Sequence, residues 1–461
     1  MKFLSLIVML TIPALASAQP SPSAGQAQSG SGSLTPLSPL SPLTLDEAIA
    51  QGLANSRRLA EIEARVEAAD FAIAGRQAAD RPIVALQGGY ARTNHVDEFA
   101  IALPGRAPQI VYPDIPNNYR SRIDLQWPIY TGGRADALER AARAERGAVT
   151  KDLDAARADL RLEITRAFWA VVTARDTETV LRRSLEAVTA HVADVRARLA
   201  SGLIPPSDVS SAEAQASHQR LLALEAANQR AIAEADFRRL TGNDTATPAE
   251  RVTGTVSGGP PGPAPENASV PVADLIARAL KTRPERQALE QRAASADLRA
   301  AAVASSARPQ IALGGGYDYA RPNPRIFPRR GDWNTSWDAS INLTWMLWDG
   351  GRRAAEHGEA RATASALKTR VEDFDLQVTF EVRARVLELA SSREAVTAAD
   401  DEIRAATEAE RVVGERYKAG VATSTDVLEA QVARLQAELD RARAVAGVRL
   451  ADARLERAVG K

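Results

Sequence analysis

The sequence predicts an α+β membrane protein in which four short strands interrupt a series of very long helices. Two similar halves, period-two alternation in two segments of each half, and helical patterns far longer than a globular helix lead to this fold. The chain has 461 residues, 58 of them basic and 58 acidic, and no cysteine. The balanced charge gives no support to a nucleic-acid partner. The lack of cysteine excludes disulfides, a cysteine nucleophile and an N-terminal lipid on cysteine.

Residues 1–18 have the features of a secretory signal peptide. Lys2 supplies the positive start, residues 3–10 are apolar, and Ala16-Ser17-Ala18 is a small-residue cleavage site. The apolar run is shorter than the ~20 residues that a helix needs to cross a bilayer, and no later segment is long and apolar enough. We therefore expect an exported protein that enters a membrane only through strands.

Two segments rich in Pro, Ser and Gly divide the remaining chain. Residues 19–43 form an N-terminal lead, and residues 242–270 form a linker between the halves. The first repeat is assigned to residues 44–241 and the second to 271–461. Both are expected to run in the order helix, strand, strand, long helix, helix.

Short motifs recur in the two halves. The run IVALQGGY at 83–90 returns as QIALGGGY at 310–317, and Gly132-Gly133-Arg134 returns as Gly350-Gly351-Arg352. The distance along the sequence between the two copies is shorter for the second motif than for the first. The two halves therefore differ in length in the loop between their two strands. This pattern predicts two internal structural repeats.

Four segments alternate apolar and polar side chains with a period of two. They lie at about 82–93, 119–130, 309–320 and 335–348. Of the six Trp only Trp169, and of the seven Tyr only Tyr417, lie outside the strand regions and their loops. Alternation with flanking aromatic residues is typical of transmembrane barrel strands. A soluble sheet with one buried face is the alternative, but it does not account for only four strands amid so much helix.

Apolar residues at steps of three and four mark a coiled-coil-like seam in the rest of the chain. Helices are predicted at about 44–79, 134–200, 206–241, 271–304, 352–418 and 424–459. Each of the two longest helices would span roughly 100 Å at ~1.5 Å per residue. The two shorter helices of each half, stacked end to end, would match the long one.

Four strands cannot close a barrel, and an open sheet edge in lipid leaves backbone groups unpaired at several kcal/mol each. Three chains would supply twelve strands. Two chains would supply eight, but an eight-stranded barrel is filled by its own side chains. A lumen lined by polar residues needs the wider form; these residues are Arg122, Asp338, Ser340 and Asn342. The expected assembly is therefore a homotrimer.

The turns of the chain resemble those of the TolC-like outer-membrane factors of tripartite efflux pumps and type I secretion systems. The matching motifs are Gly132-Gly133-Arg134, Asp349-Gly350-Gly351-Arg352, GLIPPSD at 202–208 and YKAGVATSTDVLEA at 417–430. The resemblance covers nearly all of 44–460. It implies a trimeric 12-stranded transmembrane β-barrel in the outer membrane, continuing into a long periplasmic α-helical barrel. It also implies a periplasmic adaptor (membrane fusion) protein as a partner and, through it, an inner-membrane pump.

The function expected from this resemblance is a passive conduit for export to the outside, as the outer-membrane channel component of an efflux pump or secretion system. The alternative is a periplasmic coiled-coil adaptor or structural protein without a pore. That alternative predicts one helical hairpin and a soluble β domain, without duplicated aromatic strands.

The turns at about 201–206 and 419–424 lie farthest from the strands, and form the tip. Gly202 and Gly420 end the long helices there and mark the adaptor-docking turns. Ser207, Thr423 or Ser424 can cap the next helix, with Asp208 and Asp426 in its first turn.

Asp426 and Glu429 share a helix face, so a trimer would carry two stacked carboxylate rings that narrow the tunnel and favour cations. The alternative is that Asp426 only complements its helix terminus. In the resembled family, matching positions form the constriction. Asp208 and Tyr417, with Ser207 beside them, match positions that close the tip. The arginine expected two residues after Gly420 is Ala422, so we expect another residue, such as Arg416 or Lys418, to serve.

No group of residues predicts catalysis, a cofactor or a metal site. The histidines are scattered without ligand-like spacing; they are His95, His191, His218 and His357. The glycine run 314–316 lacks a phosphate-loop lysine and is interpreted as a kink in a strand. The chain is therefore not expected to be an enzyme.

Overall fold

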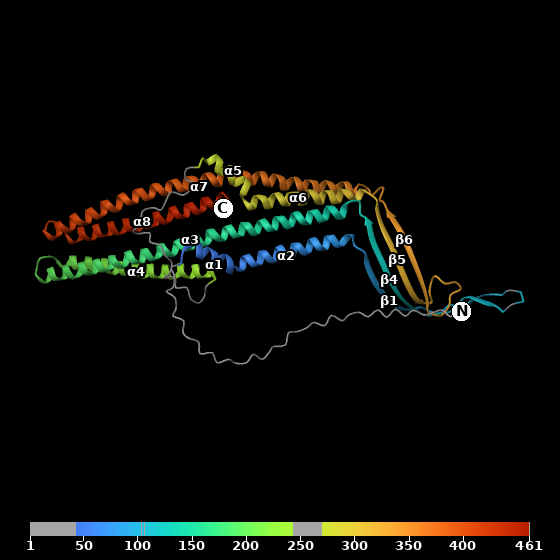
Figure 1. Ribbon diagram of the computed structural model, residues 1–461. Helices are drawn as coiled ribbons and strands as arrows, with labels where there is room; N and C mark the ends of the chain where they lie inside the picture. The colour runs from blue at the N-terminus through green and yellow to red at the C-terminus, as the bar shows by residue number, and fades with distance from the viewer. Residues whose placement is uncertain (1–42, 103, 106, 243–269, 461) are drawn as a thin grey trace, which may run out of the picture. The chain divides into compact units, whose positions relative to one another are not determined.

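The computed structural model describes residues 43–102, 104–105, 107–242 and 270–460, which belong to one compact unit. The described part is mostly helical, with a small sheet (Figure 1). The predicted signal peptide at 1–18, nearly all of the N-terminal lead at 19–43 and nearly all of the linker at 242–270 lie outside the described residues.

Eight helices lie in the described residues, four in each half. They are α1 (Leu45–Asn55), α2 (Arg57–Gln77), α3 (Arg134–Ala200), α4 (Pro206–Thr241), α5 (Val272–Thr282), α6 (Pro284–Ala304), α7 (Arg352–Lys418) and α8 (Ser424–Ala458). The long helices α3 and α7 have 67 residues each. Short 3₁₀ turns, η1 (Ala78–Asp80) and η4 (Ser305–Ala307), follow α2 and α6.

The single helices predicted at 44–79 and 271–304 are each divided in two. At the first break the Ser56 hydroxyl accepts a hydrogen bond from the Leu59 N–H at 3.3 Å and caps α2. At the second break Pro284 begins α6, and the residue before a proline is disfavoured in helical conformation. Arg283 accordingly has extended dihedral angles. These local signals override the apolar periodicity that runs through both breaks.

Four strands form one antiparallel sheet in the order β1-β4-β5-β6. They are β1 (Ile83–Arg92), β4 (Asn117–Tyr130), β5 (Gln310–Arg321) and β6 (Asn334–Thr344). The last strand ends at Thr344, earlier than the predicted 348, because its partner β5 starts at Gln310 and offers no further backbone groups for pairing. A two-stranded hairpin that the sequence did not predict, β2 (Phe99–Ile101) and β3 (Gln109–Tyr112), lies in the longer β1–β4 loop.

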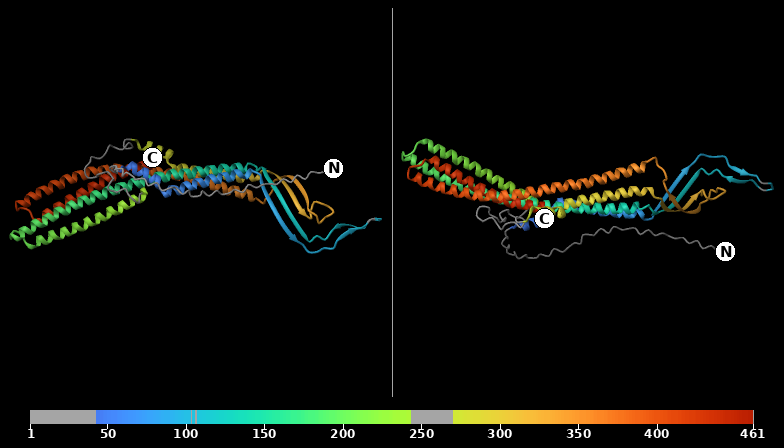
Figure 2. Two further views of the ribbon diagram at one scale, coloured as in Figure 1. Left: turned by 60° about the horizontal axis from the view of Figure 1, so that its bottom comes forward. Right: turned by 90° about the horizontal axis from the view of Figure 1, so that it is seen from above.

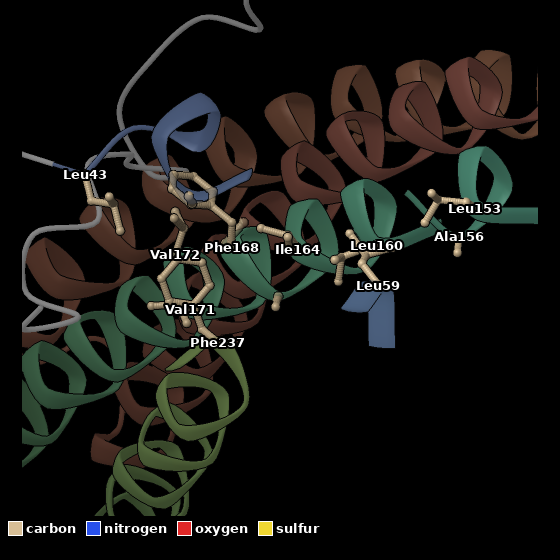
Figure 3. Close-up of a cluster of buried hydrophobic side chains, with 13 residues drawn as sticks. Leu43, Leu59, Leu153, Ala156, Leu160, Ile164, Phe168, Val171, Val172 and Phe237 are labelled. Atoms are coloured by element: carbon tan, nitrogen blue, oxygen red, sulfur yellow. The ribbon is translucent and has the colours of Figure 1, made fainter. Parts of the chain in front are cut away.

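The core follows the long helices. Around α3, Ile164, Phe168 and Val171 are buried together with Leu59 of α2 and Phe237 of α4 (Figure 3). Around α7, a similar cluster joins α5 and α8; it contains Leu275, Val378, Val382, Leu389 and Leu455. The predicted seam is therefore the buried face of each long helix.

The hairpins α3–α4 and α7–α8 lead away from the sheet and lie side by side in all views (Figures 1 and 2). Since α3 alone connects β4 to the α3–α4 turn, that turn lies about 100 Å from the end of the sheet. The structure thus separates two candidate regions, the sheet and the turns at the far ends of the long helices.

Candidate channel surfaces

One face of the sheet is an exposed apolar surface. Leu86, Ile123, Tyr317 and Trp337 lie in register across the four strands, and all four are exposed. Ile341, on the same face of β6, is 74% exposed. Soluble monomers rarely leave an apolar surface of this extent uncovered, whereas lipid covers such a surface in a membrane.

Aromatic side chains lie at both ends of this apolar face. The cluster at the loop end, called here the loop-end belt, consists of Tyr90, Tyr119, Tyr319 and Trp333, with ring centroids 4.7–5.7 Å apart between neighbours. At the helix end, the indole N–H groups of Trp127 and Trp345 donate to the carbonyl oxygens of Asp80 and Ala307 at 3.0 and 3.1 Å.

The two groups of rings are separated by a distance suited to a bilayer. The stretch of β4 from Tyr119 to Trp127 is about 27 Å long at ~3.4 Å per residue. Transmembrane barrels carry an apolar band ~25 Å tall between two aromatic girdles, crossed by tilted strands. The apolar face and its rings therefore have the dimensions of a lipid-facing surface.

The opposite face of the sheet carries five ionised side chains, called here the sheet ion network: Arg120, Arg122, Asp124, Asp318 and Asp338. Arg122 lies at the centre, where its Nη1 atom is 2.9 Å from Asp338 Oδ1 and also contacts Asp318. Its Nε atom is 2.5 Å from Asp124 Oδ1, and Arg120 Nε is 2.5 Å from Asp318 Oδ1. This face is polar, as a water-filled lumen requires.

Gly316 makes room for the network. A Cβ atom at this position would overlap the guanidinium group of Arg122. The pairing of β5 is continuous through the glycine run, and the register shift lies in β4, between Pro128 and Tyr130. The absent side chain serves the ion pairs of the neighbouring strand.

The strand-to-helix turns use glycine for its backbone freedom. Positive φ angles of 68°, 87°, 70° and 91° occur at Gly132, Gly133, Gly350 and Gly351. Gly132 is also packed closely, since an added Cβ atom would lie 2.9 Å from the Ser305 carbonyl oxygen. The side chain of Asp349 fixes the second turn by accepting from the Gly351 N–H at 3.2 Å.

The two tip turns have the same hydrogen bonds. Gly202 has a φ of 70°, and the N–H of Leu203 donates to the Arg198 carbonyl at 3.0 Å. Gly420 has a φ of 75°, and the N–H of Val421 donates to the Arg416 carbonyl at 2.9 Å. Both turns are Schellman motifs, in which glycine allows the left-handed residue that ends the helix.

Asp426 and Glu429 are exposed on the first turns of α8. Of the three hydroxyl residues considered as caps, Thr423 caps the helix: it accepts from the Asp426 N–H at 3.2 Å, while its own N–H donates to Asp426 Oδ2 at 2.7 Å. The backbone hydrogen bond from Thr423 lowers the pKa of Asp426. Glu429 has no ion pair among the described residues.

The other predicted tip residues lie around Tyr417, which is buried. The ring of Tyr417 lies 4.3 Å below the guanidinium carbon of Arg198 and 5.5 Å from the ring of His191. Burial raises the pKa of Tyr417, and Asp208 is close enough to raise it further. Ser207 is exposed, and its hydroxyl donates to Asp208 Oδ1 at 3.3 Å rather than capping α4.

The sequence analysis did not single out His191 and Arg198. A hydrogen bond of 2.8 Å joins His191 Nε2 to Ser424 Oγ and links α3 to the start of α8. Burial lowers the pKa of His191. Of the two residues proposed to replace the arginine missing at position 422, Arg416 donates to the Val421 carbonyl at 3.5 Å and lies close enough to Asp426 to help lower its pKa, whereas Lys418 pairs with Glu415 at 3.0 Å.

Neither a metal-binding group of side chains nor a helix long and apolar enough to cross a membrane is found in the described residues. A sheet with an apolar face between aromatic rings, an ionised opposite face and long helices at one end defines the class of outer-membrane channel proteins. The chain belongs to the outer membrane efflux protein family, whose model matches residues 48–243 and 275–461. Members of this family are channels, not enzymes.

Solved structures share the fold. A membrane protein from Pseudomonas aeruginosa has a TM-score of 0.75 and 22% identity, with 90% of this chain and 92% of that chain covered. The Campylobacter jejuni CmeC outer membrane channel has a TM-score of 0.73 and 15% identity, with 90% and 85% covered. The outer membrane protein VceC from Vibrio cholerae has a TM-score of 0.71 and 18% identity, with 90% and 96% covered. No curated protein matches the chain in sequence.

Proposed function

We propose that three copies of the chain form a 12-stranded barrel in the outer membrane. The observation that carries the proposal is the open sheet: in the order β1-β4-β5-β6, the outer edges of β1 and β6 have no partner strand among the described residues. In lipid, each unpaired backbone group on these edges would cost several kcal/mol. Pairing β6 of one copy with β1 of the next satisfies both edges.

The direction of the strands supports this closure. Neighbouring strands are antiparallel throughout the sheet, so β1 and β6 run in opposite directions. A β6–β1 pair between two copies is therefore antiparallel as well, and the alternation continues around a ring. Twelve strands leave a lumen in which the sheet ion network faces water, whereas eight strands would be filled by side chains.

Engineered cysteines test the assembly, because the chain has no cysteine of its own. Three double variants are compared, each with Gln87→Cys in β1 and one cysteine in β6: Ser336→Cys, Ser340→Cys or Asn342→Cys. The variant whose two cysteines lie in register is expected to crosslink neighbouring copies. All four positions lie on the polar face of the sheet. Denaturing gels under oxidising conditions should show a ladder that stops at three subunits.

Gln87→Cys without a partner cysteine in β6 is the matched control and should stay monomeric on the gel. A ladder that stops at two subunits or continues beyond three would contradict the trimer.

The proposed channel continues from the barrel into the periplasm as a tunnel of helices, with the turns at Gly202 and Gly420 meeting a periplasmic adaptor. Through the adaptor the channel serves an inner-membrane pump of a tripartite efflux or type I secretion system. The support is the length of α3 and α7, each about 100 Å at ~1.5 Å per residue. Residues 1–18 are proposed as the cleaved export signal.

The two halves are proposed to derive from duplication. Each has an 11-residue helix, a 21-residue helix, a 3₁₀ turn, strands and a 67-residue helix in the same order. The duplication places two helical hairpins in each copy, and three copies would supply six around the tunnel.

The tip is proposed to close through contacts around Tyr417, with Asp426 and Glu429 as the constriction and Asp208 and Ser207 beside the closing contacts. Arg198 supplies the positive charge at this place in the absence of an arginine at Ala422, because its guanidinium group stacks on the Tyr417 ring. Such a contact is worth ~0.5–1 kcal/mol at an exposed site and ~2 kcal/mol when desolvated, and the buried Tyr417 ring places this one between the two.

An adaptor or structural protein without a pore is the competing function. Membrane fractionation separates the two: the channel should remain in the outer-membrane fraction through a salt wash and leave it only with detergent. Release as a soluble periplasmic species would favour the competitor.

A further inference from the structure

Two arginines flank the loop-end belt on the apolar face of the sheet. Arg92 follows Tyr90 by two positions in β1, and Arg321 follows Tyr319 by two positions in β5. Because side chains two apart in a strand point to the same side, both arginines share the face of the aromatic rings. Both are exposed.

The register places Arg321 level with Tyr119 of the loop-end belt and Arg92 about 7 Å farther toward the loops, at ~3.4 Å per residue. Arg92 pairs with Asn117 of β4, and Arg321 pairs with Tyr119 of the same strand. Since β4 alone separates β1 from β5, the two backbones are about 10 Å apart. Each copy of the chain therefore presents two guanidinium groups at the loop end of the apolar face, one level with the outermost rings and one just beyond them.

Neither guanidinium group is neutralised. Among the described residues no carboxylate forms an ion pair with Arg92 or Arg321, and Arg321 Nε donates to the Gly331 carbonyl at 2.5 Å, which leaves its two terminal nitrogens for a ligand. Asp114 of the adjacent loop is held elsewhere, 2.6 Å from His95 Nδ1. Two unpaired positive charges next to an apolar belt fit a ligand that is both anionic and lipidic.

We propose that Arg92 and Arg321 bind the phosphate groups of lipid headgroups in the outer leaflet of the membrane. This inference rests on the proposed barrel, in which the helices lie on the periplasmic side and the β1–β4 and β5–β6 loops on the outside. The aromatic rings then lie at the boundary between acyl chains and headgroups, and the arginines, at and just beyond the level of the outermost rings, lie within reach of the phosphates. Arginine matches phosphate because its planar fork donates two parallel hydrogen bonds.

The test uses the full-length protein, purified as a trimer and reconstituted in phosphatidylcholine nanodiscs, with bisphosphorylated lipid A as the titrated probe. Arg92→Gln with Arg321→Gln is expected to weaken lipid A binding roughly tenfold to thirtyfold, at ~1 kcal/mol per arginine. The matched control is Arg220→Gln, which removes one exposed charge from α4 and should leave binding unchanged. Arg92→Lys with Arg321→Lys keeps the charges and should retain most of the affinity.

Equal lipid A binding by the Gln pair and the native trimer would overturn the proposal. Competition by inorganic phosphate as effective as that by lipid A would also overturn it, because a free anion rather than a lipid would then be the ligand. Both results are obtained on an intact trimer, so they are distinct from a failure of the proposed barrel, which would appear as the absence of a trimer.

Discussion

Asp426→Asn combined with Glu429→Gln is expected to reduce the cation preference of the channel several-fold, toward equal permeability, and to raise its conductance. Three copies would place six of these carboxylates around the narrowest part of the tunnel, and rings of Asp and Glu select for cations. Both side chains are exposed, and Glu429 has no ion pair within the part of the chain that the structure describes. Reversal potentials in planar bilayers under a salt gradient measure the change.

Asn at position 426 removes the negative charge of Asp426 but can keep its hydrogen bond at the start of α8. Asp426 also accepts the Thr423 N–H, and an amide oxygen can continue to do so. Thr423→Ala is the matched control: it removes the capping hydroxyl at a cost of about 1 kcal/mol and leaves every carboxylate in place, so ion selectivity should not change. Unchanged selectivity in the Asp426 and Glu429 variant would refute the carboxylate rings.

The pH dependence of selectivity follows from the same contacts. The hydrogen bonds from Thr423 lower the pKa of Asp426, so this carboxylate keeps its charge to a lower pH than an ordinary aspartate. Cation preference should therefore persist in mildly acidic solution and disappear once Asp426 takes up a proton.

The spacing of apolar residues along the sequence was enough to predict the strands and the long helices. Alternation located the strands, since each strand has an apolar and a polar face. Seams at steps of three and four located the long helices, because a buried stripe such as Leu160, Ile164 and Val171 must face a partner helix. The turn glycines could be predicted because these turns need a positive φ, which glycine adopts most easily.

Contacts between distant segments could not be predicted in the same way. Arg198 and Tyr417 lie on different long helices, and nothing in the sequence around either residue indicates the other. The same holds for Arg122 and Gly316 of β5, since nothing in the sequence indicates that the guanidinium group fills the space where a Cβ atom would lie. The breaks at Ser56 and Arg283 had local signals, a capping serine and a following proline, but the apolar seam hid them.

Arg457→Ala is expected to destabilise the helical part by about 3 kcal/mol, the low end for a broken buried pair, because it leaves the half-buried Glu285 carboxylate without its main partner. Arg457, near the end of α8, is 8% exposed. Its Nε atom donates to Asp159 Oδ1 of α3 at 2.8 Å, and its Nη2 atom contacts Glu285 of α6. One side chain thus joins three helices from both halves. Thermal unfolding of the purified protein in detergent measures the loss.

Two control variants distinguish the effect of burying Arg457 from the effect of its charge. Arg404 pairs with Asp401 on the surface of α7, where both side chains are largely exposed, so Arg404→Ala should cost less than 1 kcal/mol. Arg457→Met with Glu285→Met removes both the buried arginine and its half-buried partner and should recover most of the stability, since Arg283 keeps Glu381. If Arg457→Ala cost no more than the surface control, the buried pair would not be a determinant of stability.

Lowering the pH should reduce the difference in unfolding temperature between the native protein and the Arg457→Ala variant. Burial alone would raise the pKa of Glu285, but the hydrogen bond and charge of Arg457 more than offset it, so the pKa lies below its ordinary value. A carboxylate with a depressed pKa contributes stability that is present above its unfolded pKa and is lost as the pH falls through the folded one. Without Arg457, burial becomes the dominant influence and the pKa of Glu285 rises above its ordinary value. As the pH falls, protonation of Glu285 then stabilises the folded variant, whereas it destabilises the folded native protein. The two unfolding temperatures should therefore approach each other as the pH falls, whereas a constant gap would mean that Arg457 acts through packing alone.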